Sequence, residues 1–436
     1  MSTPSTNAVM RMQGWPGGIN NRSREGDPVR VAESQDGLPA SIYLRDALNV
    51  DISNTGIVKR REGYSLVKAG FSHSAWGSPN LSWGLVVVDG WLSRLLDTGE
   101  VTPLQQVHPY APLSYALVND RVAWCNGRQS GFVSAAKHSV FGLPDPTPPT
   151  LSKIDGNLRA GTYNVKTTYL NADKEEFGAS EEAVIQLQDS EGIRIQAGGP
   201  DFGASYVASY VSLPDSEVYF QVAVQSTDSA VDITQSDIGR GATLRTDDLK
   251  LLPTGHLVRM YNGRLYMAYV DTVVFSEPLR YSLYRPSQGL YMFPSKVTML
   301  EVTTNGLYIG GDFGVVFLEG ADPYQVTQRV VSTATPVTGA STTVSGIDIN
   351  EPVDSAVVWW TKSGELVAGL PSGNLKFLTR DRLAIPEFKT GSIMLREKEG
   401  TRSLVASLRK GSDVNSMAAS DSVVAEVRKN NVKLNQ

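Results

Sequence analysis

The stretch VRMYNGRLYMAYVDTVVFSEP, from Val258 to Pro278, decides the fold class of this chain. Its three short runs, rich in Val, Tyr, Met, Leu and Phe, are separated by Asn262-Gly263 and Val270-Asp271. Asn-Gly is the favoured centre of a two-residue hairpin turn, because both turn positions need positive φ, and the flanking residue types suit half-buried strands. The stretch therefore predicts a hairpin followed by a third strand. A lone hairpin is only marginally stable in water, so this unit must pack on others.

The same pattern of strand, tight turn, strand, turn and strand recurs along the chain. Further copies are VVVDGWLSRLLDTGEVTPL (86–104), ALVNDRVAWCNGRQSGFV (116–133), LEVTTNGLYIGGDFGVVFLEG (300–320) and VVWWTKSGELVAGLPSGNLKFL (357–378), with NVDISNTGIVKRREGYSLV (49–67) as a sixth. Asn305-Gly306 is predicted to form a turn like that of Asn262-Gly263. Because such small sheets cannot bury their faces alone, the repeats predict an all-β, β-propeller-like array of hairpin blades. A single β-sandwich or barrel built from hairpins is the alternative.

Composition places the chain among soluble globular proteins. It has 436 residues, of which 41% are hydrophobic and 19% charged, enough for two or three domains. No apolar run is long enough to span a membrane, and none of signal-peptide length follows Arg11, so we expect neither a membrane span nor classical secretion. The single cysteine, Cys125, suits a reducing cytosol, and its place in a strand predicts a packed thiol and not a nucleophile.

Charge is unevenly distributed around a formal net of −5. Residues 151–250 carry 8 Lys/Arg and 16 Asp/Glu, a net of −8, whereas residues 389–436 carry 9 and 5, a net of +4. No segment has the strong basic excess of a nucleic-acid clamp, so we expect any DNA nearby to pass without being gripped. The densest basic cluster, Lys59-Arg60-Arg61, is a candidate contact to DNA phosphate or to a neighbouring subunit, with an exposed turn as the alternative.

Composition shifts divide the chain into five parts. They are an extended N-terminal arm (1–40), the first part of the propeller (41–146), an inserted immunoglobulin- or fibronectin-like β-sandwich (147–250), the second part of the propeller (251–390) and a C-terminal tail (391–436). The four prolines between Pro144 and Pro149 are expected to form a stiff linker that cannot continue a sheet. Arm and tail are expected to be ordered mainly by partner subunits.

No motif in the sequence predicts catalysis, a metal or a cofactor. The four histidines lack metal-ligand spacing, and IGGDFG at 309–314 lacks the Lys-Ser/Thr of a phosphate loop, so it predicts a hairpin turn. The acidic stretches at 173–182 and Asp247-Asp248 lack calcium-loop spacing and are expected to be solvated. Adjacent Trp359 and Trp360 must point to opposite faces of one strand, one into the core and the other toward a neighbour.

Several stretches together resemble the tail hub or nozzle proteins of short-tailed bacteriophages, the tail tubular B-like, DNA-stabilisation-type group. Two central stretches of the chain, 262–286 and 297–323, are similar to sequences of that family. The chain departs from the family at Arg61-Glu62-Gly63, where the family usually has Arg-Pro-Gly. The opening phrase, "A-x-N-V-D" before a Gly and an Arg-rich "R-x-G-Y", is matched by Ala47, Asn49, Val50, Asp51, Gly56, Arg60, Arg61, Gly63 and Tyr64.

The resemblance implies a structural virion protein, made in the host cytoplasm, that forms a six-membered homo-oligomeric ring. Such a ring extends the tail channel below the portal and adaptor, meets tail fibre or needle proteins, and lets duplex DNA pass without sequence-specific binding. Two alternatives from other classes stay open. One is a carbohydrate-binding or glycan-cleaving propeller, which needs convergent carboxylates and aromatics, and the other is a receptor-binding module carried by the sandwich.

Overall fold

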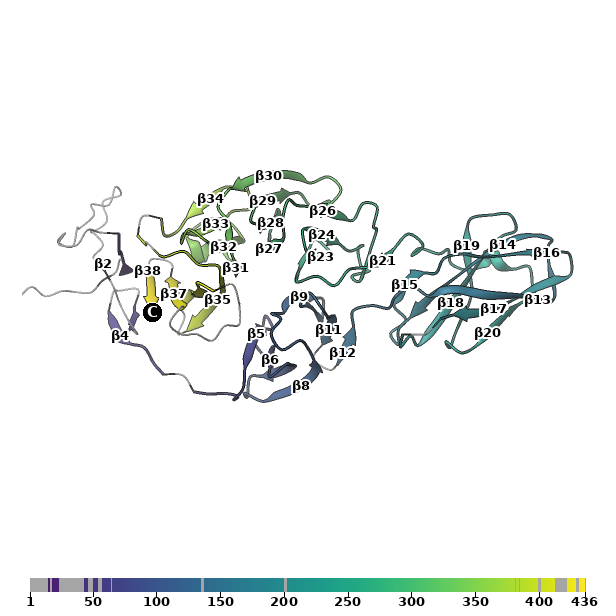
Figure 1. The fold of residues 1–436 in the computed structure, drawn as a ribbon, viewed down its shortest axis with the longest axis horizontal. Helices are drawn as coiled ribbons and strands as arrows, with labels where there is room; N and C mark the ends of the chain where they lie inside the picture. The colour runs from purple at the N-terminus through teal and green to yellow at the C-terminus, as the bar shows by residue number, and fades with distance from the viewer. Residues whose placement is uncertain are drawn as a thin grey trace, which may run out of the picture. The chain divides into compact units, whose positions relative to one another are not determined.

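The computed structural model describes residues 15, 18–22, 43–45, 50–53, 57–63, 65–134, 137–199, 202–380, 382–383, 385–398, 401–411, 422–428 and 431–435. Short antiparallel strands dominate these residues, and their only helical turns are the 3₁₀ segments η1 (Ile238–Arg240) and η2 (Gly346–Ile349) (Figure 1). The chain divides into two compact units, 74–293 and 1–73 together with 294–436. Each unit is described by itself below.

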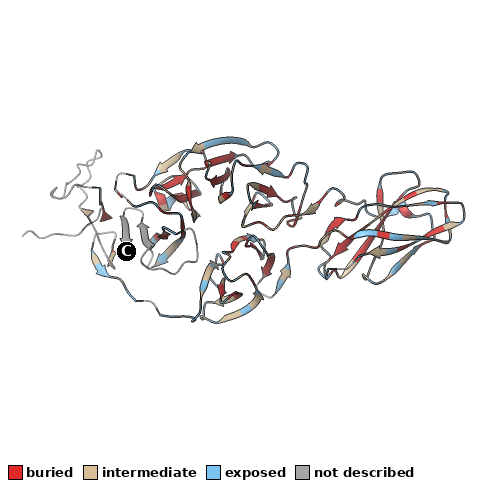
Figure 2. Cartoon of the chain, in the orientation of Figure 1, coloured by how far each residue is buried: buried red, intermediate tan, exposed pale blue. Residues whose placement is uncertain are grey.

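Unit 74–293 contains three four-stranded blades, each a small antiparallel sheet. Their strand orders are β5-β6-β7-β8, β9-β10-β11-β12 and β22-β23-β24-β26. The bounds are β5 Ser72–Gly77, β6 Trp83–Val88, β7 Trp91–Leu96, β8 Val101–Gln106, β9 Ser114–Val118, β10 Arg121–Cys125, β11 Ser130–Ser134, β12 His138–Val140, β22 Leu257–Tyr261, β23 Arg264–Tyr269, β24 Thr272–Phe275 and β26 Leu290–Met292. The strands β6, β10 and β23 in the middle of these blades are mostly buried, as the red segments of Figure 2 show, which is expected of sheets covered on both faces.

A β-sandwich interrupts these blades. One sheet has the order β13-β17-β20 and the other β15-β14-β18-β19, with β16 also paired to β14. The bounds are β13 Thr147–Leu158, β14 Gly161–Leu170, β15 Glu176–Ala179, β16 Ala183–Leu187, β17 Glu191–Gly198, β18 Tyr206–Ser212, β19 Tyr219–Gln225 and β20 Ala230–Ile233. Tyr163, Val165, Ile193 and Ile195 fill the core between the sheets. A short sheet of β21 (Lys250–Leu251) and β25 (Leu283–Tyr284) follows the sandwich.

The second unit contains one four-stranded blade and an eight-stranded sheet made of two four-stranded halves. The halves meet at a single parallel pairing, Thr338 with Thr390. The bounds are β27 Val297–Thr303, β28 Gly306–Gly311, β29 Gly314–Glu319, β30 Thr327–Ser332, β31 Pro336–Val344, β32 Ala356–Thr361, β33 Leu366–Gly369, β34 Leu375–Phe377, β35 Thr390–Lys398, β36 Thr401–Arg409, β37 Ser422–Arg428 and β38 Asn431–Asn435.

Short N-terminal strands pack into the core of this second unit. They are β1 (Gly18–Ile19), β2 (Tyr43–Leu44), β3 (Val50–Ile52) and β4 (Val58–Arg60). Ile19 and Ile52 are fully buried in one cluster with Val337 and Leu404. Most of the predicted arm, 1–40, lies outside the described residues.

The chain is therefore all-β, a propeller-like array of hairpin blades with an inserted β-sandwich, and the alternative of one sandwich or barrel is wrong. Asn262 and Gly263 have φ values of 43° and 75°, which confirms the first predicted turn. The prediction for Asn305-Gly306 is wrong, because Thr303 pairs with Gly306 and the turn is centred on Thr304-Asn305 without positive φ. Gly306 is needed for another reason: a Cβ there would lie 2.1 Å from the Leu318 carbonyl oxygen.

Three further expectations differ from the structure. The repeat at 49–67 forms only the two-stranded β3-β4 sheet, because its third run ends in exposed Leu66 and Val67. The C-terminal segment, expected to be ordered mainly by partner subunits with one strand at 401–408, forms four strands, β35 to β38; β36 confirms the expected strand and buries Leu404, Ala406 and Leu408. The expected stiff proline linker partly enters a strand, since 148–149 lie in β13 at a register shift on a sheet edge, where proline is tolerated.

Gly306→Ala is expected to destabilise the second unit by about 1–3 kcal/mol, because the added methyl overpacks β28 against β29. Gly63→Ala is the control, since a Cβ at Gly63 has no atom within 4 Å. Thermal and urea unfolding midpoints check this. Equal midpoints for the two variants would contradict the role assigned to Gly306.

Candidate interaction surfaces

The predicted basic cluster lies on the β3-β4 hairpin, and the structure separates its three members. Lys59 and Arg60 are exposed at the end of β4. Arg61 instead turns back onto β3, with its Nε 3.8 Å from Asp51 Oδ1 and only 13% of its side chain exposed. Lys59 and Arg60 can therefore bind an external anion, whereas Arg61 pairs with Asp51 and stabilises the β3-β4 hairpin.

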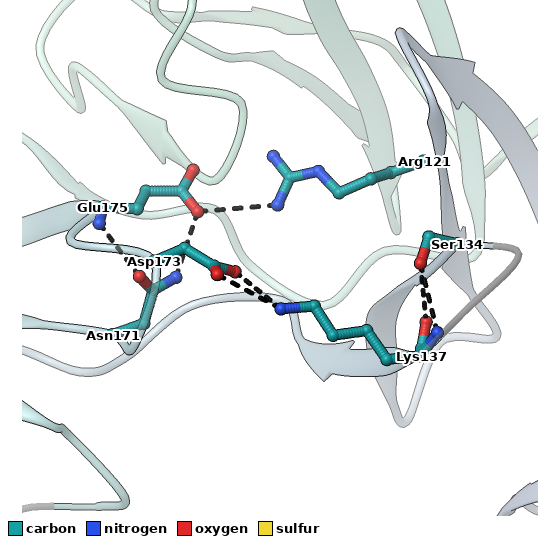
Figure 3. Close-up of polar contacts among 6 residues, drawn as sticks. All are labelled: Arg121, Ser134, Lys137, Asn171, Asp173 and Glu175. Carbon is teal, nitrogen blue, oxygen red and sulfur yellow. Dashed lines mark hydrogen bonds and ion pairs between the residues drawn. The ribbon is translucent and has the colours of Figure 1, made fainter.

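A second charged surface joins the β14-β15 hairpin of the sandwich to the blades of the same unit. We define the junction cluster as Asp173, Glu175 and Glu176 of the hairpin with Arg121, Lys137 and Arg280 of the blades; Figure 3 shows four of the six, all but Glu176 and Arg280. Lys137 Nζ lies 2.9 Å from Asp173 Oδ2, and Arg121 Nη1 lies 3.6 Å from Glu175 Oε2. Three sandwich carboxylates thus face three blade cations.

Local hydrogen bonds hold the carboxylates of the junction cluster in place. Asn171 Oδ1 accepts from the Glu175 backbone N–H at 2.9 Å, and Asn171 Nδ2 donates to Glu175 Oε2 at 3.2 Å (Figure 3). Glu176 Oε1 accepts from Thr168 Oγ1 at 2.8 Å and from the Tyr210 hydroxyl at 2.6 Å. Burial raises the pKa of Tyr210, and the bond to Glu176 raises it further, so this hydroxyl stays a donor at neutral pH.

An apolar layer lies beside the junction cluster. Leu143, Leu249 and Leu283 from the connecting segments pack with Tyr169 and Phe177 of the sandwich. Exposed ion pairs contribute about 0–1 kcal/mol each, whereas burial of one Leu side chain contributes about 1.5–3 kcal/mol. The apolar layer therefore holds the sandwich to the blades, and the ion pairs fix its orientation.

These pairings change the interpretation of the acidic segment. Asp173, Glu175 and Glu176 are not merely solvated charges, because they face blade cations. The other predicted acidic pair behaves similarly, with Asp247 Oδ1 2.5 Å from Lys166 Nζ and Asp248 Oδ2 3.0 Å from Arg285 Nη1. Sequence reasoning missed this surface, and the net charge of −8 over 151–250 was its only signal.

The cysteine and the glycine-rich stretch take the structural roles that the sequence predicts for them. Cys125 is fully buried, and burial raises the pKa of its thiol despite the nearby Arg259, so it is protonated at neutral pH. IGGDFG forms the predicted hairpin turn, with Gly311 paired to Gly314. Over the described ranges no three His, Cys, Asp or Glu side chains converge as metal ligands, and no helix is long and apolar enough to cross a bilayer.

A pocket of about 400 Å³ opens between β30 and β34 in the second unit. The guanidinium of Arg380 lies 3.3 Å from the ring centre of Phe377, and its Nε lies 2.8 Å from Glu365 Oε1. Val330, Val331 and Leu375 form the apolar wall, and Ser332 and Thr333 supply hydroxyls. Because Arg380 covers Phe377 and neutralises Glu365, the pocket lacks the open aromatic platform and paired acids of a glycan-cleaving site.

No protein-family model and no curated protein sequence matches this chain. Similar solved structures include Hsv2p of Kluyveromyces lactis, with 11% identity over 84% of this chain and 97% of that one, at a TM-score of 0.30. The Pan2 WD40 domain of Neurospora crassa is 9% identical over 77% of this chain and 86% of that one, at a TM-score of 0.30. AztD of Citrobacter koseri is 10% identical over 72% of this chain and 88% of that one, at a TM-score of 0.28. At such scores the likeness carries no functional argument, and the fold assignment stands on the sheets themselves.

Arg61→Ala is expected to lower the stability of the β3-β4 hairpin by about 1–3 kcal/mol, because it leaves the partly buried Asp51 without this cation. Lys59→Ala is the matched control and should change stability by less than about 0.5 kcal/mol, since its side chain is exposed. Hydrogen exchange of residues 50–63 measures both. Faster exchange in the Lys59 variant than in the Arg61 variant would refute the division of roles.

Leu283→Ala is expected to destabilise unit 74–293 by about 2–5 kcal/mol, because it leaves a cavity in the apolar layer beside the junction cluster. Lys137→Ala should cost less than about 1 kcal/mol, because the Lys137–Asp173 pair is more than half exposed. Calorimetry of the full chain separates the two effects. A Lys137 variant as unstable as the Leu283 variant would show that charge, and not apolar packing, holds the junction.

Proposed function

We propose that this chain is a structural virion protein, a ring-forming nozzle or hub subunit of a short-tailed bacteriophage tail that lines the DNA ejection channel below portal and adaptor. One observation carries the proposal: the family-like phrases coincide with built elements of the fold. The phrase at 47–64 contributes the β3-β4 hairpin, whose Ile52 is fully buried beside Val337 and Leu404. The phrases at 262–286 and 297–323 contribute β23 and β24 of one blade and β27 to β29 of the blade that follows it in the sequence.

Electrostatics supports a conduit for DNA. Each phosphate neutralised by Lys or Arg adds salt-sensitive affinity, which would slow the exit of a duplex. The chain carries a net charge of −5, and many of its cations are engaged with carboxylates of the same unit, as at Lys137, Lys166 and Arg285. Duplex DNA passes such a wall without sequence-specific binding, and the exposed Lys59 and Arg60 supply local contact to DNA or to the next subunit.

The proposal assigns the chain to the virion after synthesis in the host cytoplasm, with no enzymatic activity and no cofactor. Its partners are copies of itself in a six-membered ring, the portal and adaptor, and tail fibre or needle proteins. A heterologous ring interface joins two different patches on neighbouring copies. The acidic excess of 151–250 and the basic excess of 389–436 give such patches complementary charge.

A second function, receptor binding through the inserted sandwich, has one observation in its favour. The sandwich exposes large apolar side chains, among them Val184, Phe202, Val218 and Val224. Large exposed apolar residues on a soluble domain mark interaction sites when they form a patch. This function and a subunit role in a tail are compatible, because the exposed apolar side chains of the sandwich are not members of the junction cluster.

The purified chain is expected to form a closed ring of six copies, which loosens as salt is raised because charge complementarity contributes to its interface. Mass photometry at 50 mM and 500 mM NaCl and negative-stain microscopy measure this. In the phage particle, density for the chain is expected on the tail axis. A stable monomer, density elsewhere in the particle, or glycan hydrolysis abolished by one carboxylate substitution would each overturn the proposal.

A further inference from the structure

Strand β30 is an unusually open sheet edge among the outer strands of the blades. Proteins blunt such edges with short strands, proline or charge, because unpaired backbone N–H and C=O groups recruit other chains. Among the five hairpin blades, β12, β26 and β34 have three residues each and β8 contains Pro103. β30 has six residues, TQRVVS, with no proline, and is the last strand of its described sheet.

Side chains on β30 do not protect this edge. Its first four residues are exposed, and Val330 is 63% exposed, so the strand is pale in Figure 2 at the position labelled β30 in Figure 1. The one charge, Arg329, folds back over the Phe317 ring and donates to the Ser372 carbonyl oxygen. A register shift leaves Val331 unpaired as a β-bulge, so the regular edge of β30 that is open to another chain is Thr327 to Val330.

The pocket beside β30 selects one kind of side chain. Its apolar wall of Val330, Val331 and Leu375 and its volume of about 400 Å³ suit one medium-sized apolar group. Arg380 is the more accessible member of the ion pair at the rim, because its side chain is 49% exposed whereas that of Glu365 is 18% exposed. A carboxylate next to the apolar group therefore meets a favourable potential.

We propose that β30 and this pocket bind an extended segment of a partner protein, which adds to the blade as a further strand and places an apolar side chain, flanked by a carboxylate, in the pocket. Backbone hydrogen bonds to the strand edge supply affinity, and the pocket supplies specificity, as in other cases of strand addition. The site goes beyond the proposed function, because the open edge exists whether or not the chain forms a ring.

A library of random twelve-residue peptides displayed on a carrier tests the proposal, with selection on the full chain and counter-selection on Val330→Arg. We expect a consensus with an apolar residue beside Asp or Glu. The consensus peptide should bind Val330→Arg at least tenfold more weakly than wild type, and Arg380→Gln severalfold more weakly at low salt. Val140→Arg, on the short edge strand β12, is the matched control, since Val140 is 61% exposed and its variant should bind like wild type.

Backbone N-methylation of the peptide distinguishes strand addition from simple apolar contact. Because alternate N–H groups of a strand face the sheet, methylation of one alternate set should abolish binding and methylation of the other should leave it unchanged. Equal effects of the two sets, the absence of a consensus, or equal binding to Val330→Arg would overturn the proposal. Self-association of the chain that is lost in Val330→Arg, without any peptide consensus, would assign the edge to a second copy and overturn it too.

Discussion

Packing of Tyr308 against Trp359 is the contact on which the blades of the second unit depend. The rings lie 5.6 Å apart between β28 and β32, and the Tyr308 hydroxyl donates to the Leu370 carbonyl oxygen at 2.6 Å. Gly369 allows this approach, because a Cβ there would lie 2.5 Å from the Tyr308 ring. Every residue of β28 and β32 is buried, so neither sheet could keep both faces from water without its neighbour. Stability then comes from nearest-neighbour interfaces, as in other repeat architectures.

Turn chemistry and residue alternation predicted the blades, and tertiary packing decided the exceptions. The opposite directions of Trp359 and Trp360 followed from strand geometry, and the two side chains indeed enter different cores. Asn305-Gly306 looked like Asn262-Gly263, yet a close approach from Leu318 shifted the turn by one residue. The C-terminal sheet was predicted only in part, as a strand at 401–408, because its burial depends on segments far away in sequence, such as the one carrying Ile52.

The interaction surfaces were less predictable than the blades, because their partners are distant in sequence. Local patterns report which residues alternate or turn, but not that Asp173 pairs with Lys137 or that Glu176 faces Arg280. The basic cluster was located correctly, whereas the separate position of Arg61 required the register of β3 against β4. The pocket beside β30 combines residues from two hairpins and has no signature in either.

One core combines residues from the first 52 positions of the sequence with residues of β36, and this constrains how the protein folds during synthesis. Ile19 and Ile52 leave the ribosome early, but the cluster that buries them includes Leu404 and Leu408 near the other end. At about 5–20 residues per second, roughly 20–70 s separate the synthesis of Ile52 from that of Leu404. Residues 74–293 form their own unit and can fold during that interval. The N-terminal segment must meanwhile stay soluble without its core partners. Its polar composition, rich in Ser, Asn, Asp and Gly, favours solubility in the unfolded state.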